Sequence, residues 1–151
     1  MFRYFLQQIV PLLDVVYNSG NLGSTLGLPK FTKFLRDSTY IDSFSLGVMI
    51  GILIGDACFN KKAGVPKRVN NVRISFKQSI NNFPFLWTVF TALSHYCPNL
   101  PRLDYTTIRG VKYTGVKFET RLLPCITILY EKFMEDGRKS IPVDRVILLP
   151  M

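Results

Sequence analysis

An apolar run that ends abruptly in charge sets the tightest limit on this fold. Residues 43–62 read SFSLGVMIGILIGDACFNKK, with no charged side chain from Phe44 to Ile54 and then Asp56 and two lysines. As an α-helix, this run of about 12 residues covers about 18 Å, whereas the hydrocarbon core of a bilayer is about 30 Å thick. We therefore expect a buried helix of a globular domain and no membrane span.

Three glycines, Gly47, Gly51 and Gly55, recur at every fourth position of that helix. Because each glycine costs about 1 kcal/mol of helix propensity, a stripe of three needs a compensating contact. Close approach of a second helix is one such contact, and packing on the domain's own sheet is the other. We favour the helix–helix interface, because the acid that follows, Asp56, would then be delivered to it.

Composition indicates one basic globular domain. The 151 residues include 48% hydrophobic and 19% charged side chains, and the net charge is +9. This charge favours nucleic acid or an anionic membrane surface as a partner, with simple solubility as the alternative. Three scattered cysteines and one histidine, His95, predict neither a disulfide framework nor a zinc site, and favour a reducing compartment. The first residues lack a signal-peptide pattern, which favours the cytosol or synthesis inside an organelle.

Residues 72–79 predict a strand with two different faces. Val72, Ile74 and Phe76 alternate with Arg73, Ser75 and Lys77, which indicates an apolar inner face and a basic outer one. A helical apolar pattern follows, with Asn82 as its N-cap and Pro84 in its first turn.

A second strand pair and a further helix complete the pattern. The segment 103–120 predicts a hairpin that turns at Arg109–Gly110, and 122–137 predicts a helix stopped by Gly137. Residues 138–151 lead into another apolar element. We expect residues 1–40 to form an N-terminal extension and 41–151 a single α+β domain, in the order helix, hairpin, helix, hairpin, helix.

The segment MIGILIGDA resembles the LAGLIDADG helix of homing endonucleases and intron maturases, and the likeness continues over residues 44–149. The resemblance implies an αββαββα fold, an antiparallel sheet saddle with its helices on one face. In that family, two motif helices pack through small residues, and each presents one acid that binds Mg²⁺ at the base of the saddle. Alignment on Asp56 places Gly51 and Gly55 at the small packing positions, with Ala57 in place of the motif's last glycine.

The same resemblance implies functional residues. Asp56, with Ala57 beside it, falls at the metal site, and Gln78 at the residue that orders water in the active site. Arg121 falls where a basic residue steadies the phosphate in the transition state. For Gln78 the alternative is a hydrogen bond at a strand end, and for Arg121 an exposed charge before a helix. The positions expected to contact nucleic acid are Lys61, Lys62, Lys67, Arg68, Arg73, Ser75, Lys77, Arg109, Lys112 and Lys117.

Two function hypotheses remain open. With one motif and one acid, a DNA endonuclease of this type needs a homodimer or a separate second half. The alternative is a half-domain that binds nucleic acid without cutting, as an RNA maturase or as a structural component of an organellar ribonucleoprotein. The resemblance favours an organelle, the mitochondrion before the chloroplast. The sequence does not give the target site, the choice between DNA and RNA, the partner, or the role of residues 1–40.

Overall fold

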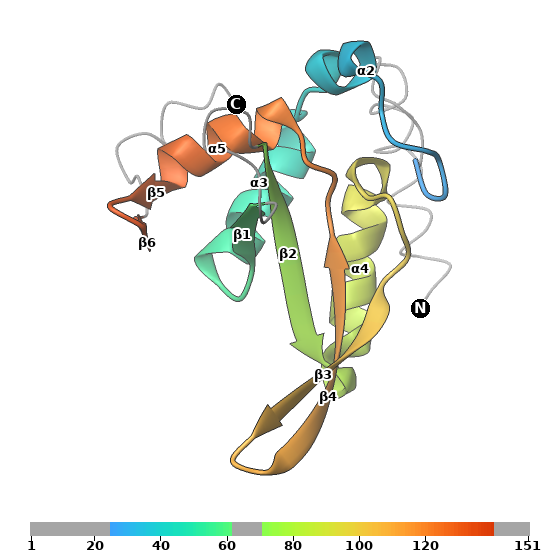
Figure 1. Ribbon diagram of the computed structural model, residues 1–151, viewed down its shortest axis with the longest axis vertical. Coiled ribbons are helices and arrows are strands. Elements are labelled where there is room, and N and C mark those ends of the chain that lie inside the picture. Colours follow the sequence, from blue (N-terminus) through green and yellow to red (C-terminus); the bar gives the residue numbers. More distant parts are fainter. Residues whose placement is uncertain (1–24, 62–70, 141–151) are drawn as a thin grey trace.

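The structure, a computed structural model, describes residues 25–61 and 71–140 (Figure 1). From α3 to α5 the chain follows the predicted order of helix, two strands, helix, two strands, helix. Within the described part of the chain, no helix is long and apolar enough to cross a membrane. The elements are α2 (Lys33–Ser38), α3 (Ser43–Ile54), β1 (Cys58–Lys61), β2 (Val72–Ser79), α4 (Phe83–Leu93), β3 (Arg102–Ile108), β4 (Val111–Glu119), α5 (Pro124–Phe133), β5 (Met134–Glu135) and β6 (Arg138–Lys139).

Four strands form one antiparallel sheet in the order β1-β2-β4-β3. The alternation predicted for β2 is confirmed, since Val72, Ile74 and Phe76 are buried in the core while Arg73 and Lys77 are not. In Figure 1, α4 lies behind β3 and β4, and the β3–β4 hairpin extends past the end of this helix. The predicted turn at Arg109–Gly110 is also present, with both residues at positive φ.

The core is a single cluster between the sheet and its helices. Its buried side chains come from α3, α4, α5, β2 and β4, among other segments. Phe118 of β4 lies edge-on to Phe76 and Phe90, with ring centroids 5.8 and 5.5 Å away. These contacts fix the inner face of the sheet against the helices, so the alternate residues of each strand point to the opposite face. The α+β fold predicted from the sequence is therefore confirmed.

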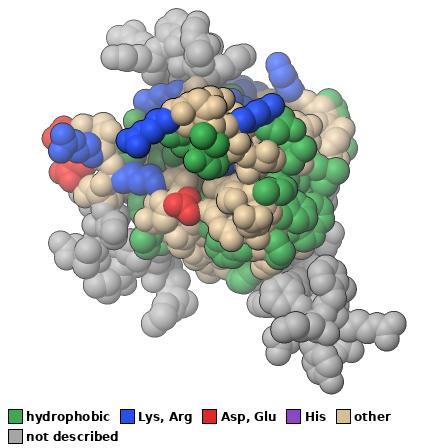
Figure 2. Space-filling model, turned by 90° about the horizontal axis from the view of Figure 1, so that it is seen from below, with side chains coloured by type: hydrophobic (Ala, Val, Ile, Leu, Met, Phe, Trp, Pro, Cys, Tyr) green, Lys and Arg blue, Asp and Glu red, His purple; other side chains and the backbone are tan. Residues whose placement is uncertain are grey.

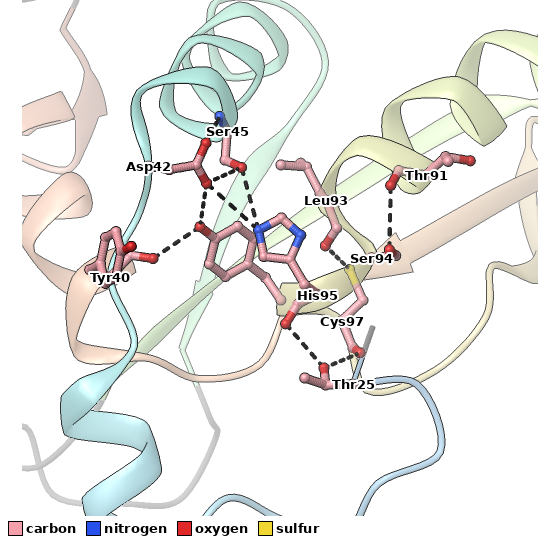
Figure 3. A network of polar contacts seen from close by, with 10 residues as sticks. Thr25, Tyr40, Asp42, Ser45, Thr91, Leu93, Ser94, His95 and Cys97 are labelled. Atoms are coloured by element: carbon pink, nitrogen blue, oxygen red, sulfur yellow. Dashed lines mark hydrogen bonds and ion pairs between the residues drawn. The ribbon is translucent and has the colours of Figure 1, made fainter. Parts of the chain in front are cut away.

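Helix α3 is anchored at its first turn by a polar network (Figure 3). Asp42 is the N-cap, and its carboxylate accepts hydrogen bonds from the Ser45 amide at 3.0 Å and the Ser45 hydroxyl at 2.7 Å. The Tyr96 hydroxyl lies 3.2 Å from the same carboxylate, and His95 Nε2 lies 3.8 Å from it. This network joins the start of α3 to the segment that follows α4 (Figure 3).

Three local predictions need correction or lie outside the described residues. Helix α5 ends at Phe133, not at Gly137, because Asp136 and Gly137 form the turn of a short β5–β6 hairpin at φ 49° and 76°. Asn82 precedes α4 as predicted, but its side chain makes no capping hydrogen bond. The apolar element expected near the C-terminus lies mostly in residues 141–151, outside the described part.

Residues 25–40 contact the domain. The buried Thr25 hydroxyl donates to the carbonyl oxygens of His95 and Cys97, each at 3.1 Å, and Phe31 packs against the core cluster. Helix α2 was not expected from the sequence, and Thr32 caps it. The boundary between an extension and a domain at residue 40 stays a prediction.

Candidate functional site

Asp56 lies at the end of the apolar helix beside the far end of β2. Helix α3 stops at Ile54 because Gly55 leaves the helical conformation, with φ −91° and ψ −119°, and Asp56 follows with an exposed carboxylate. Its Oδ2 accepts a hydrogen bond of 2.7 Å from Nε2 of Gln78, the second-last residue of β2. The structure thus brings together two of the three side chains that the resemblance assigned to catalysis.

The amide of Gln78 is held at both ends. A carboxylate only accepts hydrogen bonds, so Gln78 must turn its NH₂ group to Asp56 and its oxygen away. That oxygen accepts a bond of 3.2 Å from the side-chain NH₂ of Asn82. Asn82 therefore belongs to the site. Sequence reasoning missed this role because an asparagine before a helix is already explained as an N-cap; the four-residue spacing from Gln78 was the available signal.

A second residue that sequence reasoning missed is Lys139 of β6. Its ammonium group donates to the carbonyl oxygens of Leu53 at 3.0 Å, Gly55 at 3.4 Å, and Ala57. These carbonyls belong to the last turn of α3 and to the residues on either side of Asp56 in the chain, so Lys139 stabilises the C-terminal end of α3. No local signal points to this contact, which joins residues 82 to 86 positions apart.

The donor set at Asp56 supplies only part of a metal site. In the described residues, no group of three or more His, Cys, Asp or Glu side chains could hold a metal ion. The predicted ligand Ala57 has a buried side chain, and its carbonyl oxygen accepts from Lys139. One exposed carboxylate still fits the way proteins bind Mg²⁺, which takes one or two carboxylates and completes its octahedron with water and phosphate oxygens.

Arg121 does not join this pair, contrary to the catalytic role that the resemblance implied. Its guanidinium donates to the carbonyl oxygens of Thr25 at 2.8 Å, Leu28 at 3.3 Å and Pro29 at 3.3 Å. It also lies 4.2 Å from the ring centroid of Phe31. With 9% of its surface exposed, Arg121 is not the exposed charge of the alternative interpretation either. It is the anchor of residues 25–31.

The outer face of the sheet carries part of the predicted basic surface. Arg73 and Lys77 of β2 and Lys117 of β4 occupy alternate positions to the buried residues, and strand register adds Arg102 of β3 opposite Lys117. Ser75 lies on the same face but is only 7% exposed, which corrects its assignment as an accessible contact. Figure 2 shows lysine and arginine side chains gathered along one side of the molecule.

Two predicted contacts lie on the opposite face. Lys61 is the register partner of the buried Val72, and its ammonium sits 4.6 Å above the Tyr130 ring of α5. Lys112 and Lys117 are an odd number of positions apart on β4, so their side chains point to opposite faces of the sheet. The ammonium group of Lys112 lies 4.4 Å from the centroid of the Tyr105 ring. Lys61 and Lys112 therefore do not belong to the basic outer face.

The remaining predicted contacts divide between the hairpin turn and the undescribed segment. Arg109 is exposed in the turn between β3 and β4 at φ 50°. Lys62, Lys67 and Arg68 lie in residues 62–70, outside the described part.

The glycine stripe of α3 lies on the side away from the core. Met49, Ile52 and Leu53 fill the core, whereas Gly47 and Gly51 are exposed and a Cβ at either would meet nothing within 4 Å. The stripe therefore does not pack on the domain's own sheet, and no helix among the described residues covers it. A helix–helix contact on this side requires another helix from outside the described residues.

Comparison with known proteins relates the chain to a family and to a solved structure. The sequence model of the LAGLIDADG DNA endonuclease family matches residues 46–150. The structure is similar to that of the homing endonuclease I-WcaI bound to its DNA recognition sequence, with a TM-score of 0.64 and 21% sequence identity. This likeness covers 81% of the chain but 54% of the I-WcaI chain, so the chain spans about half of that protein. At this identity, the likeness shows a common fold.

Proposed function

The chain belongs to the LAGLIDADG DNA endonuclease family. From this premise we propose that it forms half of an active site that cleaves DNA, and that a second motif helix completes this active site. The observation that carries the proposal is the position of Asp56. An exposed carboxylate stands at the end of a helix whose glycine side is open, and Gln78 fixes its orientation through a bond of 2.7 Å. A lone structural carboxylate would not need this placement at the edge of an uncovered helix.

The chain's own residues divide the work at the scissile phosphate. Asp56 and the corresponding acid of the second motif would hold Mg²⁺, which when bound supplies a polarised phosphate and a more acidic water. Gln78 keeps the carboxylate oriented, and Asn82 keeps Gln78 oriented. Lys139 holds the end of α3, from which Asp56 follows, through its bonds to the carbonyl oxygens there.

A second motif helix would supply the second acid. Phe44 and Ile54 of α3 are 44% and 57% exposed, which adds apolar surface beside the bare glycines. Two such helices can approach closely because no Cβ stands between their backbones at Gly47 and Gly51.

The outer face of the sheet is the proposed DNA surface. It presents Arg73, Lys77, Arg102 and Lys117 from three adjacent strands, so it offers hydrogen-bond donors to a DNA duplex. I-WcaI, which shares the fold, is described as bound to its DNA recognition sequence. Localisation in an organelle and binding of RNA stay predictions.

The test compares cleavage by matched variants. Wild type, Asp56→Asn and Asp136→Asn are incubated with a library of duplex DNA sites, first with Mg²⁺ and then with Ca²⁺. Asp136 is the control because it lies in the exposed β5–β6 turn at φ 49°, a conformation that asparagine also adopts, and its replacement removes the same charge. We expect wild type and Asp136→Asn to cut with Mg²⁺, and Asp56→Asn to bind DNA without cutting.

The other outcomes are equally informative. Equal cleavage by wild type and Asp56→Asn contradicts the assignment of Asp56. If wild type binds nucleic acid in a salt-dependent way and cuts nothing, even after the oligomeric state shows paired chains, the non-cutting alternative replaces the nuclease.

A further inference from the structure

The cations of the outer sheet face are already paired with acids inside the chain. Glu119 of β4 lies 3.3 Å from Arg102, 3.6 Å from Arg73 and 3.7 Å from Lys117. Its own side chain is only 15% exposed. A single carboxylate thus stands among three cations that come from β2, β3 and β4, the three strands at the middle and edge of the sheet.

This cluster lines a hollow in the outer face. The hollow has a volume of about 310 Å³, and Asn99 and Leu100 from the segment between α4 and β3 form its opposite wall. Arg73 and Lys117 lie beyond hydrogen-bond length from Glu119, and the buried Nε of Arg73 has no hydrogen-bond partner in the described residues. The hollow is therefore lined by cationic donors and by a carboxylate acceptor.

A phosphate and Glu119 would compete for the same three cations. Each lysine or arginine that neutralises a DNA phosphate contributes about 0.9 to the slope of log affinity against log salt. A cation that is paired with a carboxylate neutralises DNA phosphates less fully. Fewer of the counterions condensed on the DNA are then released when the protein binds. A base edge is uncharged, so the Glu119 carboxylate does not repel it as it repels a phosphate. Guanine can accept from arginine donors that do not contact Glu119, and the amino group of cytosine can donate to a glutamate.

We propose that Glu119 is a specificity residue of the DNA surface, which withholds Arg73, Arg102 and Lys117 from phosphates and directs their donors and its own carboxylate to base edges. This inference rests on the proposed DNA-binding function and names the residue that separates specific from non-specific binding on that face. Asp104 shows the same arrangement on a smaller scale, because among the described residues its ion pair is with Lys77, at 2.5 Å.

The number of paired cations gives the proposal a quantitative test. Three variants each remove one negative charge: Glu119→Gln, Asp104→Asn and Glu131→Gln. Among the described ion pairs, Glu119 pairs with three cations, Asp104 with one and Glu131 with none. Affinity for a random-sequence DNA duplex is measured by fluorescence anisotropy between about 50 and 200 mM salt. Relative to wild type, the slope should steepen by between about 0.9 and 2.7 for Glu119→Gln, according to whether one or all three of its cations then contact phosphates, by at most about 0.9 for Asp104→Asn and by about 0 for Glu131→Gln.

A double variant protects the test against changes in folding. If Glu119 neutralises Arg102, then Arg102→Gln leaves the wild-type slope unchanged but reduces the slope of Glu119→Gln by about 0.9. Circular dichroism checks that each variant is folded. A slope change for Glu119→Gln no larger than that for Glu131→Gln overturns the inference while leaving the proposed function intact. Wild-type protein that shows no salt-dependent DNA binding overturns the proposed function itself.

Discussion

Replacing Arg121 by methionine tests whether this side chain is a structural anchor. Four hydrogen bonds hold the guanidinium to residues 25–29: two from Nη2 at 2.8 and 3.3 Å, one from Nη1 at 3.3 Å and one from Nε at 3.4 Å. Methionine keeps most of the apolar stem and removes every donor and the charge. The buried residue Thr25 would then have a carbonyl oxygen that has lost its partner.

The expected loss of stability is about 3 kcal/mol. A hydrogen bond from a charged group contributes about 1.5–3 kcal/mol, and the shortest bond of Arg121 is of this kind. The buried carbonyl left unpaired adds a cost of about 1–3 kcal/mol, while the weaker contacts overlap with these terms. With a urea m-value of about 1–3 kcal/mol/M, the unfolding midpoint should fall by about 1–3 M.

The single tryptophan, Trp87, reports unfolding by fluorescence, and trypsin reports local release of the anchored segment by cleavage after Lys30. The control is Arg102→Met, because the Arg102 side chain is 62% exposed and should change neither quantity. Arg121→Met should lower the midpoint or accelerate cleavage at Lys30. If it changes neither while abolishing DNA cleavage, Arg121 is catalytic after all and the anchor interpretation is refuted.

Two smaller predictions concern Gly115 and His95. A Cβ on Gly115 would lie 3.0 Å from the Gln78 carbonyl oxygen, so Gly115→Ala should destabilise the fold by about 1–3 kcal/mol in urea unfolding, and an unchanged midpoint would contradict this contact. Burial lowers the pKa of His95, although Asp42 opposes the shift, so the folded state favours the neutral ring. Stability is therefore fully present above the ordinary histidine pKa of about 6.5 and falls as pH drops below it, a dependence that His95→Asn should reduce in unfolding curves at about pH 7.5 and pH 5.5.

The parts of the fold predicted from the sequence depend on neighbouring residues. Alternation in β2 specifies which side chains enter the core, since a strand turns successive residues to opposite faces. The Arg109–Gly110 turn is similarly local, because a two-residue hairpin turn needs positive φ at both positions. Asp56 and Gln78 came from the family resemblance, and the structure adds the hydrogen bond between them.

The residues that sequence reasoning misplaced depend on distant contacts. Arg121 before α5 has the local pattern of an exposed cation, and residues 25–31, which lie 90 to 96 positions away, explain its burial. Lys139 bonds to the end of α3 across a similar separation. Charge alone predicts Lys61 as a contact, whereas its register position opposite the buried Val72 places it on the inner face of the sheet. Composition near a motif therefore identifies the charged residues, whereas strand register and tertiary contacts determine which face each charged side chain occupies.

The open side of α3 leads to a prediction that separates folding from pairing. In the single chain, Gly51 has nothing within 4 Å of a Cβ, so alanine there should raise the free energy of unfolding by about 1 kcal/mol through helix propensity. The Gly51→Leu variant should also fold, but its larger side chain would overpack the contact with a second helix, at a cost of about 1–3 kcal/mol per contact. Thermal melting and analytical ultracentrifugation measure the two effects separately. Gly51→Leu should stay folded while losing chain pairing and DNA cleavage together; pairing and cleavage equal to wild type would show that the second acid arrives by another surface.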